Sequence, residues 1–276
     1  MEPIPGTRRF CLAFILVILT TPGFSQSFNP VSVALQKHKA SAGEPIFVRV
    51  HVNNMGPEAL EFDLGLNGRE NILISVVDPS GKRSEKSGTE PRQGMALFGW
   101  MRLAPGEEQF TTLVLNEWFN FELPGQYQIT LAFKQPATVG GKKVPVPPFT
   151  LALDITPRNE EQLTATCENL VKEFEGAASS DERAATPAAL RHIRDPKLVP
   201  LWKRTLTSVN QEIREIGISN LAHIRNHDAI EALSRALRSE NQETRSLARS
   251  ALQQITIITS DPSIKKDAEN ALHQPE

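Results

Sequence analysis

The chain of 276 residues is long enough for two ordinary domains, each with its own hydrophobic core. Its 30 basic and 32 acidic residues give a formal net charge of -2 and are interspersed in both halves of the sequence. This balance excludes a basic stripe that would attract nucleic acid or an anionic membrane surface. We therefore expect no nucleic-acid partner.

The first 25 residues have the pattern of a secretory signal peptide. Arg8 and Arg9 precede an apolar run over residues 10–19, and small residues follow it. The run is about half as long as the roughly 20 residues that a membrane-spanning helix needs. We expect cleavage after Ser25 or Ser27, no stable membrane insertion of the mature chain, and a periplasmic or extracellular location. A permanent anchor and export by the twin-arginine route are the alternatives.

Cleavage at either position leaves Cys167 as the one cysteine of the mature chain, since Cys11 lies within the signal. A lone thiol cannot form an internal disulfide, so stability must come from the packed cores. Cys167 shares a helical stripe with Leu163, Leu170 and Phe174, which predicts a small buried side chain. A reactive or intermolecular thiol is the alternative.

Residues 28–157 are predicted to form an all-β domain of seven or eight strands. Short apolar runs alternate with turn residues, and no long helical period occurs. In residues 46–52 the apolar side chains alternate with period two, which is typical of a strand with one buried face. Further strands are expected at residues 72–77, 109–115, 127–133 and 149–155.

Two turn motifs in this region carry a resemblance to known domains. They are Ala-Gly-Glu-Pro-Ile at residues 42–46 and Leu-Ala-Pro-Gly-Glu at residues 103–107. They resemble hairpins of immunoglobulin-like domains in bacterial envelope proteins and of macroglobulin-like domains. Tyr127 follows Pro124 and Gly125 in a step typical of a tyrosine corner, in which the phenol bonds to an upstream backbone group. The resemblance implies an immunoglobulin-like β-sandwich and leaves its ligand open.

Two segments are longer than strands and tight turns require. Residues 81–94 are predicted to form a polar loop, and residues 135–148 a hairpin tip. Long loops at the ends of sandwiches often carry recognition, but they also collect tolerated insertions. For the aromatic run at residues 98–101, we favour a buried edge of the core over an exposed anchor, because the run alternates into Leu103.

From residue 158 onward, helical spacing replaces the strand alternation, and the sequence repeats with an offset of 31 residues. The second helix of each copy carries an arginine, a small residue, a leucine and an isoleucine at fixed spacing. The three copies are Arg183, Thr186, Leu190 and Ile193; Arg214, Gly217, Leu221 and Ile224; and Arg245, Ala248, Leu252 and Ile255.

This pattern resembles the short bacterial HEAT repeat, a pair of antiparallel helices that buries its apolar faces by stacking on its neighbours. The resemblance implies that residues 158–276 form an α-solenoid of HEAT-like repeats that presents a curved surface to another protein. Asn210 and Asn241 are predicted to cap helices. Pro187 is predicted to weaken or bend the second helix of the first copy.

Residues 263–273 are predicted to form a C-terminal capping helix with its charges in solvent. Because no repeat crosses Pro157, we expect residues 28–157 and 158–276 to be separable folding units.

The sequence contains no phosphate-binding loop, nucleophile elbow, paired-cysteine motif or zinc-protease helix. His223 and His227 are four residues apart, but Arg225 and Asn226 stand between them where the helix should end. We therefore expect no catalytic residue, no metal site and no cofactor.

The expected function is that of an exported, non-catalytic protein-binding or scaffold protein. The alternatives are an accessory subunit or inhibitor of an envelope enzyme, and an enzyme with unrecognised chemistry. If the repeats bind the protein or peptide partner, we expect the second-helix face to do so, and otherwise the sandwich loops. The positions on this face outside the buried pattern are Arg191, Glu215, Ser219, Ser246, Arg249, Ser250 and Gln253.

Overall fold

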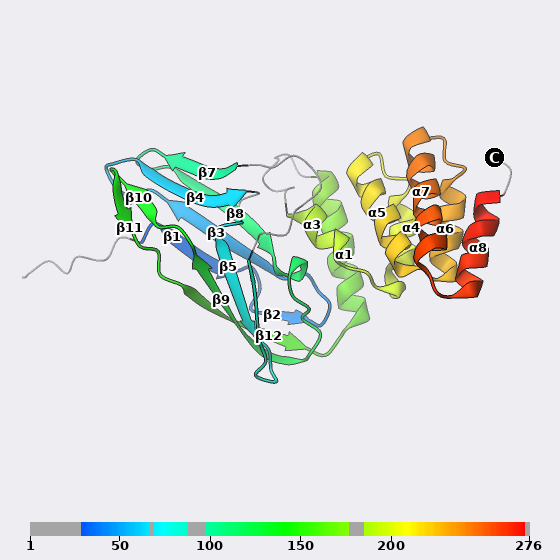
Figure 1. Cartoon of the computed structure of the whole chain (residues 1–276), viewed down its shortest axis with the longest axis horizontal. Helices are drawn as coiled ribbons and strands as arrows, with labels where there is room; N and C mark the ends of the chain where they lie inside the picture. The colour runs from blue at the N-terminus through cyan, green and yellow to red at the C-terminus, as the bar shows by residue number, and fades with distance from the viewer. Residues whose placement is uncertain (1–28, 67–68, 88–97, 177–184, 274–276) are drawn as a thin grey trace, which may run out of the picture.

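The computed structural model describes residues 29–66, 69–87, 98–176 and 185–273. An N-terminal β domain is followed by an array of helices, and the two lie end to end in an elongated molecule (Figure 1). This architecture confirms the predicted fold class. The signal-peptide prediction falls on residues outside the described ranges. Among the residues that the structure describes, no helix is long and apolar enough to cross a membrane.

The β domain contains twelve strands in three open sheets within the described residues. Their orders are β1-β3-β8, β11-β10-β4-β7 and β2-β12-β9-β5-β6, and the pairing is antiparallel except between β2 and β12. The strands are β1 (Val31–Leu35), β2 (Lys39–Ser41), β3 (Phe47–Asn53), β4 (Leu60–Leu66), β5 (Ile72–Val77), β6 (Arg83–Ser87), β7 (Phe98–Leu103), β8 (Glu108–Val114), β9 (Gly125–Phe133), β10 (Ala137–Val139), β11 (Lys142–Val144) and β12 (Phe149–Thr156).

The three sheets share one hydrophobic core, because each contributes the inward side of its alternating strands. In β3, Val48, Val50 and Val52 are buried, whereas Arg49 points to solvent. The period-two pattern at residues 46–52 therefore predicted the buried face correctly.

The expectation of seven or eight strands was too low. Strands β2, β10 and β11 have three residues each, too few for an alternating pattern to be recognised. The predicted polar loop at residues 81–94 is also partly wrong, because β6 forms within it as an edge strand paired with β5. Its sequence Arg-Ser-Glu-Lys-Ser has no apolar side to mark it. Residues 88–94 lie outside the described ranges.

The predicted hairpin at residues 135–148 is present as β10 and β11, which pair across Gly140 and Gly141. Both glycines have positive φ values, as a tight two-residue turn requires. β10 also pairs with β4, so the hairpin extends the second sheet.

The aromatic run at residues 98–101 does not form a fully buried edge. Met101 and Leu103 face the core, but Trp100 points outward and is 55% exposed. The preference for a buried edge is therefore wrong for this tryptophan, because the alternation that buries Met101 places its neighbour on the outer face.

Helices follow from residue 160. They are α1 (Glu160–Gly176), α3 (Thr186–Arg191), α4 (Val199–Thr205), α5 (Gln211–Ile224), α6 (His227–Ala236), α7 (Gln242–Ile258) and α8 (Pro262–His273), with short 3-10 turns η1 (Leu115–Glu117) in the β domain and η2 (Pro196–Leu198) before α4. The second helices stack in the order α3, α5, α7, and α8 packs on the last pair. A continuous core runs through the array.

The repeated residues occupy equivalent places in α5 and α7. Leu221 and Leu252 are fully buried, and the small residues Gly217 and Ala248 lie in the packed interior. The repeated arginines close the preceding turn. Arg214 Nη1 donates to the carbonyls of residues 208 and 209, and Arg245 Nη1 donates to those of residues 239 and 240.

The predicted helix starts are confirmed at Asn210 and Asn241. The side-chain oxygen of Asn210 accepts hydrogen bonds from the backbone of residues 212 and 213, and that of Asn241 accepts one from Thr244. Helix α5 ends before Arg225, as expected. Helix α3 has six residues, whereas α5 has 14, and Pro187 lies in its first turn, where no backbone donor is needed. The second helix of the first copy is therefore short rather than bent at this proline.

Candidate interaction surfaces

The structure places the predicted partner-binding residues on three neighbouring second helices. Arg191 ends α3, two of the residues lie on α5, and four lie on α7. Arg191, Ser246, Ser250 and Gln253 are exposed, and Glu215, Ser219 and Arg249 are half-buried. On α5 and α7 these positions lie opposite the buried stripes, so they form a polar outer surface over adjacent repeats, which we call the second-helix face.

Polar contacts between the second helices cross this surface. Arg191 Nη2 pairs with Glu212 Oε1 at 3.0 Å, joining α3 to α5. Gln211 Nε2 donates to Glu215 at 2.9 Å and also to Glu243, joining α5 to α7. The face thus carries charges of both signs, from Arg191, Glu215 and Arg249, and intramolecular contacts cross it.

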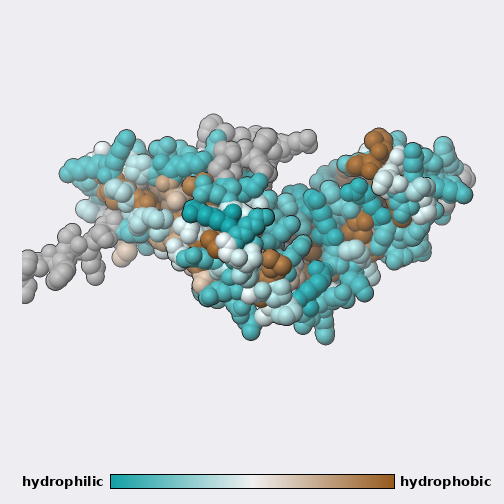
Figure 2. Space-filling view, turned by 60° about the horizontal axis from the view of Figure 1, so that its bottom comes forward, coloured by the Kyte–Doolittle hydropathy of each residue, from teal (hydrophilic) through white to brown (hydrophobic). Residues whose placement is uncertain are grey.

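The face of the molecule seen in Figure 2 is largely hydrophilic, with small, separate apolar patches. Large apolar side chains that are exposed include Met55, Trp100 and Phe110 in the β domain and Val209 and Ile257 in the helical array. Phe110 is covered on one side by stacking with His51 at 4.2 Å between ring centroids. These exposed residues do not provide a large apolar docking surface.

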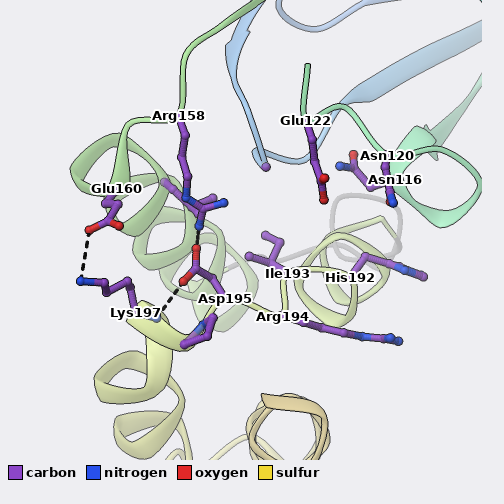
Figure 3. Close-up of a pocket in the computed structure, with 13 residues that line it drawn as sticks. Asn116, Asn120, Glu122, Arg158, Glu160, His192, Ile193, Arg194, Asp195 and Lys197 are labelled. Atoms are coloured by element: carbon purple, nitrogen blue, oxygen red, sulfur yellow. Dashed lines mark hydrogen bonds and ion pairs between the residues drawn. The ribbon is translucent and has the colours of Figure 1, made fainter. Parts of the chain in front are cut away.

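A cavity of about 550 Å³ lies where the β domain meets the helical array. Asn116, Asn120 and Glu122 stand on the β-domain side, and His192, Ile193 and Arg194 stand opposite them (Figure 3). Leu163 and Ile193 are buried apolar residues of the same lining. The cavity is lined mainly by polar and charged residues.

The charged groups at one end of this cavity are paired with one another (Figure 3). Arg158 forms an ion pair with Asp195, whose Oδ1 also accepts from the backbone of Lys197 at 2.7 Å. Lys197 Nζ lies 3.7 Å from Glu160 Oε2. These pairs connect the linker and the start of α1 to the segment between α3 and α4, and so fix this wall of the cavity within the C-terminal part of the chain.

Two buried groups behave as the sequence predicted. Cys167 is fully buried, and its burial, together with the nearby carboxylates of Glu44 and Glu168, raises the pKa of its thiol to about 12. It is therefore an unreactive, protonated core residue at neutral pH. The phenol oxygen of Tyr127 accepts a hydrogen bond from the backbone of Leu123 at 3.2 Å, which confirms the tyrosine corner.

The sequence did not indicate the cavity or the contacts around it. Its walls come from segments near residues 43, 116–122, 158–163 and 192–197, which only the fold brings together. The Gly43-Glu44 step was recognised as part of a hairpin motif, but nothing in its composition indicated contact with a helix more than 100 residues later.

Comparisons with known proteins agree with this division of the chain. Residues 36–155 match the family described as flagellar collar protein C, N-terminal domain. Residues 167–253 match the HEAT repeat family. No curated protein matches the chain.

Solved structures resemble part of the chain only weakly. A β-glucosidase from Listeria innocua is 13% identical with a TM-score of 0.27, covering 45% of this chain and 16% of its own. A CARDB domain from Pyrococcus furiosus is 15% identical with a TM-score of 0.23, covering 46% and 85%. The sporulation control protein of Bacillus subtilis is 16% identical with a TM-score of 0.25, covering 52% and 54%. This chain thus spans about a sixth of the β-glucosidase, and these similarities assign it no function.

The two family matches and the observed order of sheets and helices lead to one conclusion. The N-terminal part of the chain is similar to the N-terminal domain of flagellar collar protein C over residues 36–155, and the C-terminal part is similar to HEAT repeats over residues 167–253.

Proposed function

We propose that this chain is a non-catalytic scaffold protein of the bacterial cell envelope, and that its HEAT repeats bind a protein partner. The proposal draws on the match of the β domain to a flagellar collar protein and of the helices to HEAT repeats. The signal-like first 25 residues support an envelope location.

The observation that carries the proposal is the second-helix face. Helices α5 and α7 lie side by side and place polar side chains from successive repeats on one surface, half-buried on α5 and mostly exposed on α7. Stacked helical repeats bind partners through extended surfaces of this kind. An inhibitor of an envelope enzyme could insert the predicted loop at residues 81–94 into its target, but this alternative loses support because β6 occupies residues 83–87 of that segment.

A charge reversal on this face tests the proposal. We expect Arg249→Glu to reduce recovery of a specific envelope partner by about tenfold or more, because the reversed charge repels the partner surface that the arginine attracts. The measurement is affinity purification of the tagged full chain from envelope extract, followed by titration with the purified partner.

Lys203→Glu provides the matched control, because Lys203 is exposed on the first helix α4. Circular dichroism should show that both variants keep the wild-type helix content. If the partner binds Arg249→Glu as tightly as wild type, the second-helix face is not the binding surface, and the exposed loops of the β domain become the candidates.

A further inference from the structure

Glu44 is an unusual residue, because its carboxylate is buried although no basic side chain in the described ranges pairs with it. It lies in the turn between β2 and β3 and is 2% exposed. A buried carboxylate is costly unless hydrogen-bond donors replace the lost water. The donors around Glu44 therefore indicate what this residue holds in place.

Three donors surround the carboxylate, and two of them belong to helix α1. The backbone N–H of Ser41 donates to Oε2 at 2.5 Å from within the same turn. Gln162 Nε2 donates to Oε2 at 2.8 Å, and Thr166 Oγ1 donates to Oε1 at 2.6 Å. One turn of the β domain thus holds two side chains of α1 through a single buried charge.

Ser41 fixes the chain between the two parts. Its hydroxyl accepts a hydrogen bond from the backbone N–H of Asn159 at 2.7 Å and donates to the carbonyl of Pro157 at 3.4 Å. Gly43, with a φ of +88°, allows the close approach, since a Cβ there would lie 3.1 Å from Arg158 Nη1. The connecting residues 157–159 are therefore bonded to the β domain rather than free to move.

The contact continues on the apolar side. Val114 belongs to the buried core of the helical array, and Phe47 packs against it, although both are residues of the β domain. Arg158 extends the polar contact to Asp195 at the start of η2. Apolar packing, a buried charge and an ion pair thus meet at one junction.

We propose that residues 41–44 form a clamp that locks helix α1 onto the β domain, so that the β domain and the HEAT repeats move as one rigid body. A partner that binds the repeats is then held at a fixed position and orientation relative to the β domain. This inference goes beyond partner binding and does not depend on which surface binds the partner.

The test removes the α1 donors and measures the distance between the two parts. Spin labels are attached to the full chain at Ala152→Cys on β12 and Lys203→Cys on α4, both at exposed positions, in a Cys11→Ser background. The buried Cys167 does not compete for the label, because its thiol stays protonated. Electron–electron double resonance should give one narrow distance distribution for the otherwise unchanged chain.

The variant is Gln162→Leu with Thr166→Val, which leaves Glu44 with only the donor from its own turn. We expect the distance distribution to broaden, and the thermal unfolding midpoint to fall by roughly 5–10 °C, because a buried charge loses its partners. Thr164→Val is the matched control on the same helix, since Thr164 bonds only within α1, to the carbonyl of Glu160. It should leave the distribution narrow.

Thr166→Val alone provides a milder variant in case the double variant does not fold, and it should broaden the distribution to a smaller extent. A broad distribution in the starting chain would overturn the proposal. So would an unchanged narrow distribution in both clamp variants when their circular dichroism is that of the folded protein.

Discussion

In the helical array, the distance between neighbouring helices determines which side chains fit at single positions. Gly217 on α5 faces α4, and a Cβ at this position would overlap Thr205 Oγ1 and lie 3.1 Å from the carbonyl oxygen of Trp202. In the next repeat, the positions equivalent to Thr205 and Gly217 are Ala236 and Ala248, which are both buried. The two repeats fill the same space with different pairs of side chains.

This comparison predicts the effect of a substitution at Gly217. Replacing a helical glycine by alanine ordinarily stabilises a protein by about 0.5–1 kcal/mol. Here we expect Gly217→Ala to lower the free energy of unfolding by about 1–3 kcal/mol, because the added methyl group overpacks the α4–α5 contact. Urea unfolding followed by circular dichroism measures the change.

The double variant Thr205→Ala with Gly217→Ala recreates the pair found in the next repeat and serves as the control. We expect it to recover more than about 1 kcal/mol relative to Gly217→Ala, as strongly coupled neighbours do. The single variant Thr205→Ala completes the comparison. If the losses of the two single variants add up to the loss of the double variant, the two side chains do not compete for this space.

At the scale of elements, the repeats are held in shape by their turns as well as by their cores. Arg214 and Arg245 each donate from one Nη1 atom to two carbonyls of the turn between first and second helices. These contacts explain why an arginine recurs at this position of the repeat, although its side chain is polar. The arginine stabilises the turn that sets the angle of each helix pair.

Arg245→Met tests this role, because methionine keeps an unbranched apolar stem but loses the donors. We expect the free energy of unfolding to fall by about 1–3 kcal/mol, the range for hydrogen bonds to charged groups. Arg235→Met is the control, since Arg235 is 60% exposed and pairs only with Glu231, one turn earlier on α6. Its effect should stay within about 0.5 kcal/mol. Equal losses in the two variants would contradict a specific role for Arg245.

At the scale of the whole molecule, the central question is how the two parts depend on each other. The change of periodicity at Pro157 predicted separable folding units, and this stays a prediction. The structure adds that the helical core includes Val114 and packs against Phe47, and that Glu44 bonds to α1. A helical fragment without the β domain would expose this side of α1.

We therefore expect the fragment 158–276 to be helical but to unfold at a lower temperature than the full chain. The loss of apolar burial and of the hydrogen bonds between α1 and the carboxylate of Glu44 accounts for the difference. Thermal unfolding followed at 222 nm measures both proteins, with the fragment 28–157 as the reference for the β domain. A fragment as stable as the full chain would show that the junction contributes nothing to the stability of the helices.

The sequence by itself determined the features that rest on local periodicity. Alternation in residues 46–52 defined a strand, and the recurrence of Arg, small residue, Leu and Ile defined the helical repeats, because each pattern is a direct consequence of backbone geometry. The caps Asn210 and Asn241 followed for the same reason, since capping involves residues only two or three positions apart.

Only the tertiary structure decided the features that join distant segments. Strand β6 forms by pairing with the edge of β5, and Trp100 is exposed because it lies on the outer face of β7, opposite the buried Met101. Glu44 meets Gln162 and Thr166 across more than 100 residues of sequence. No period or local motif encodes such a contact, because it forms only when folding brings the buried carboxylate of Glu44 together with its distant donors.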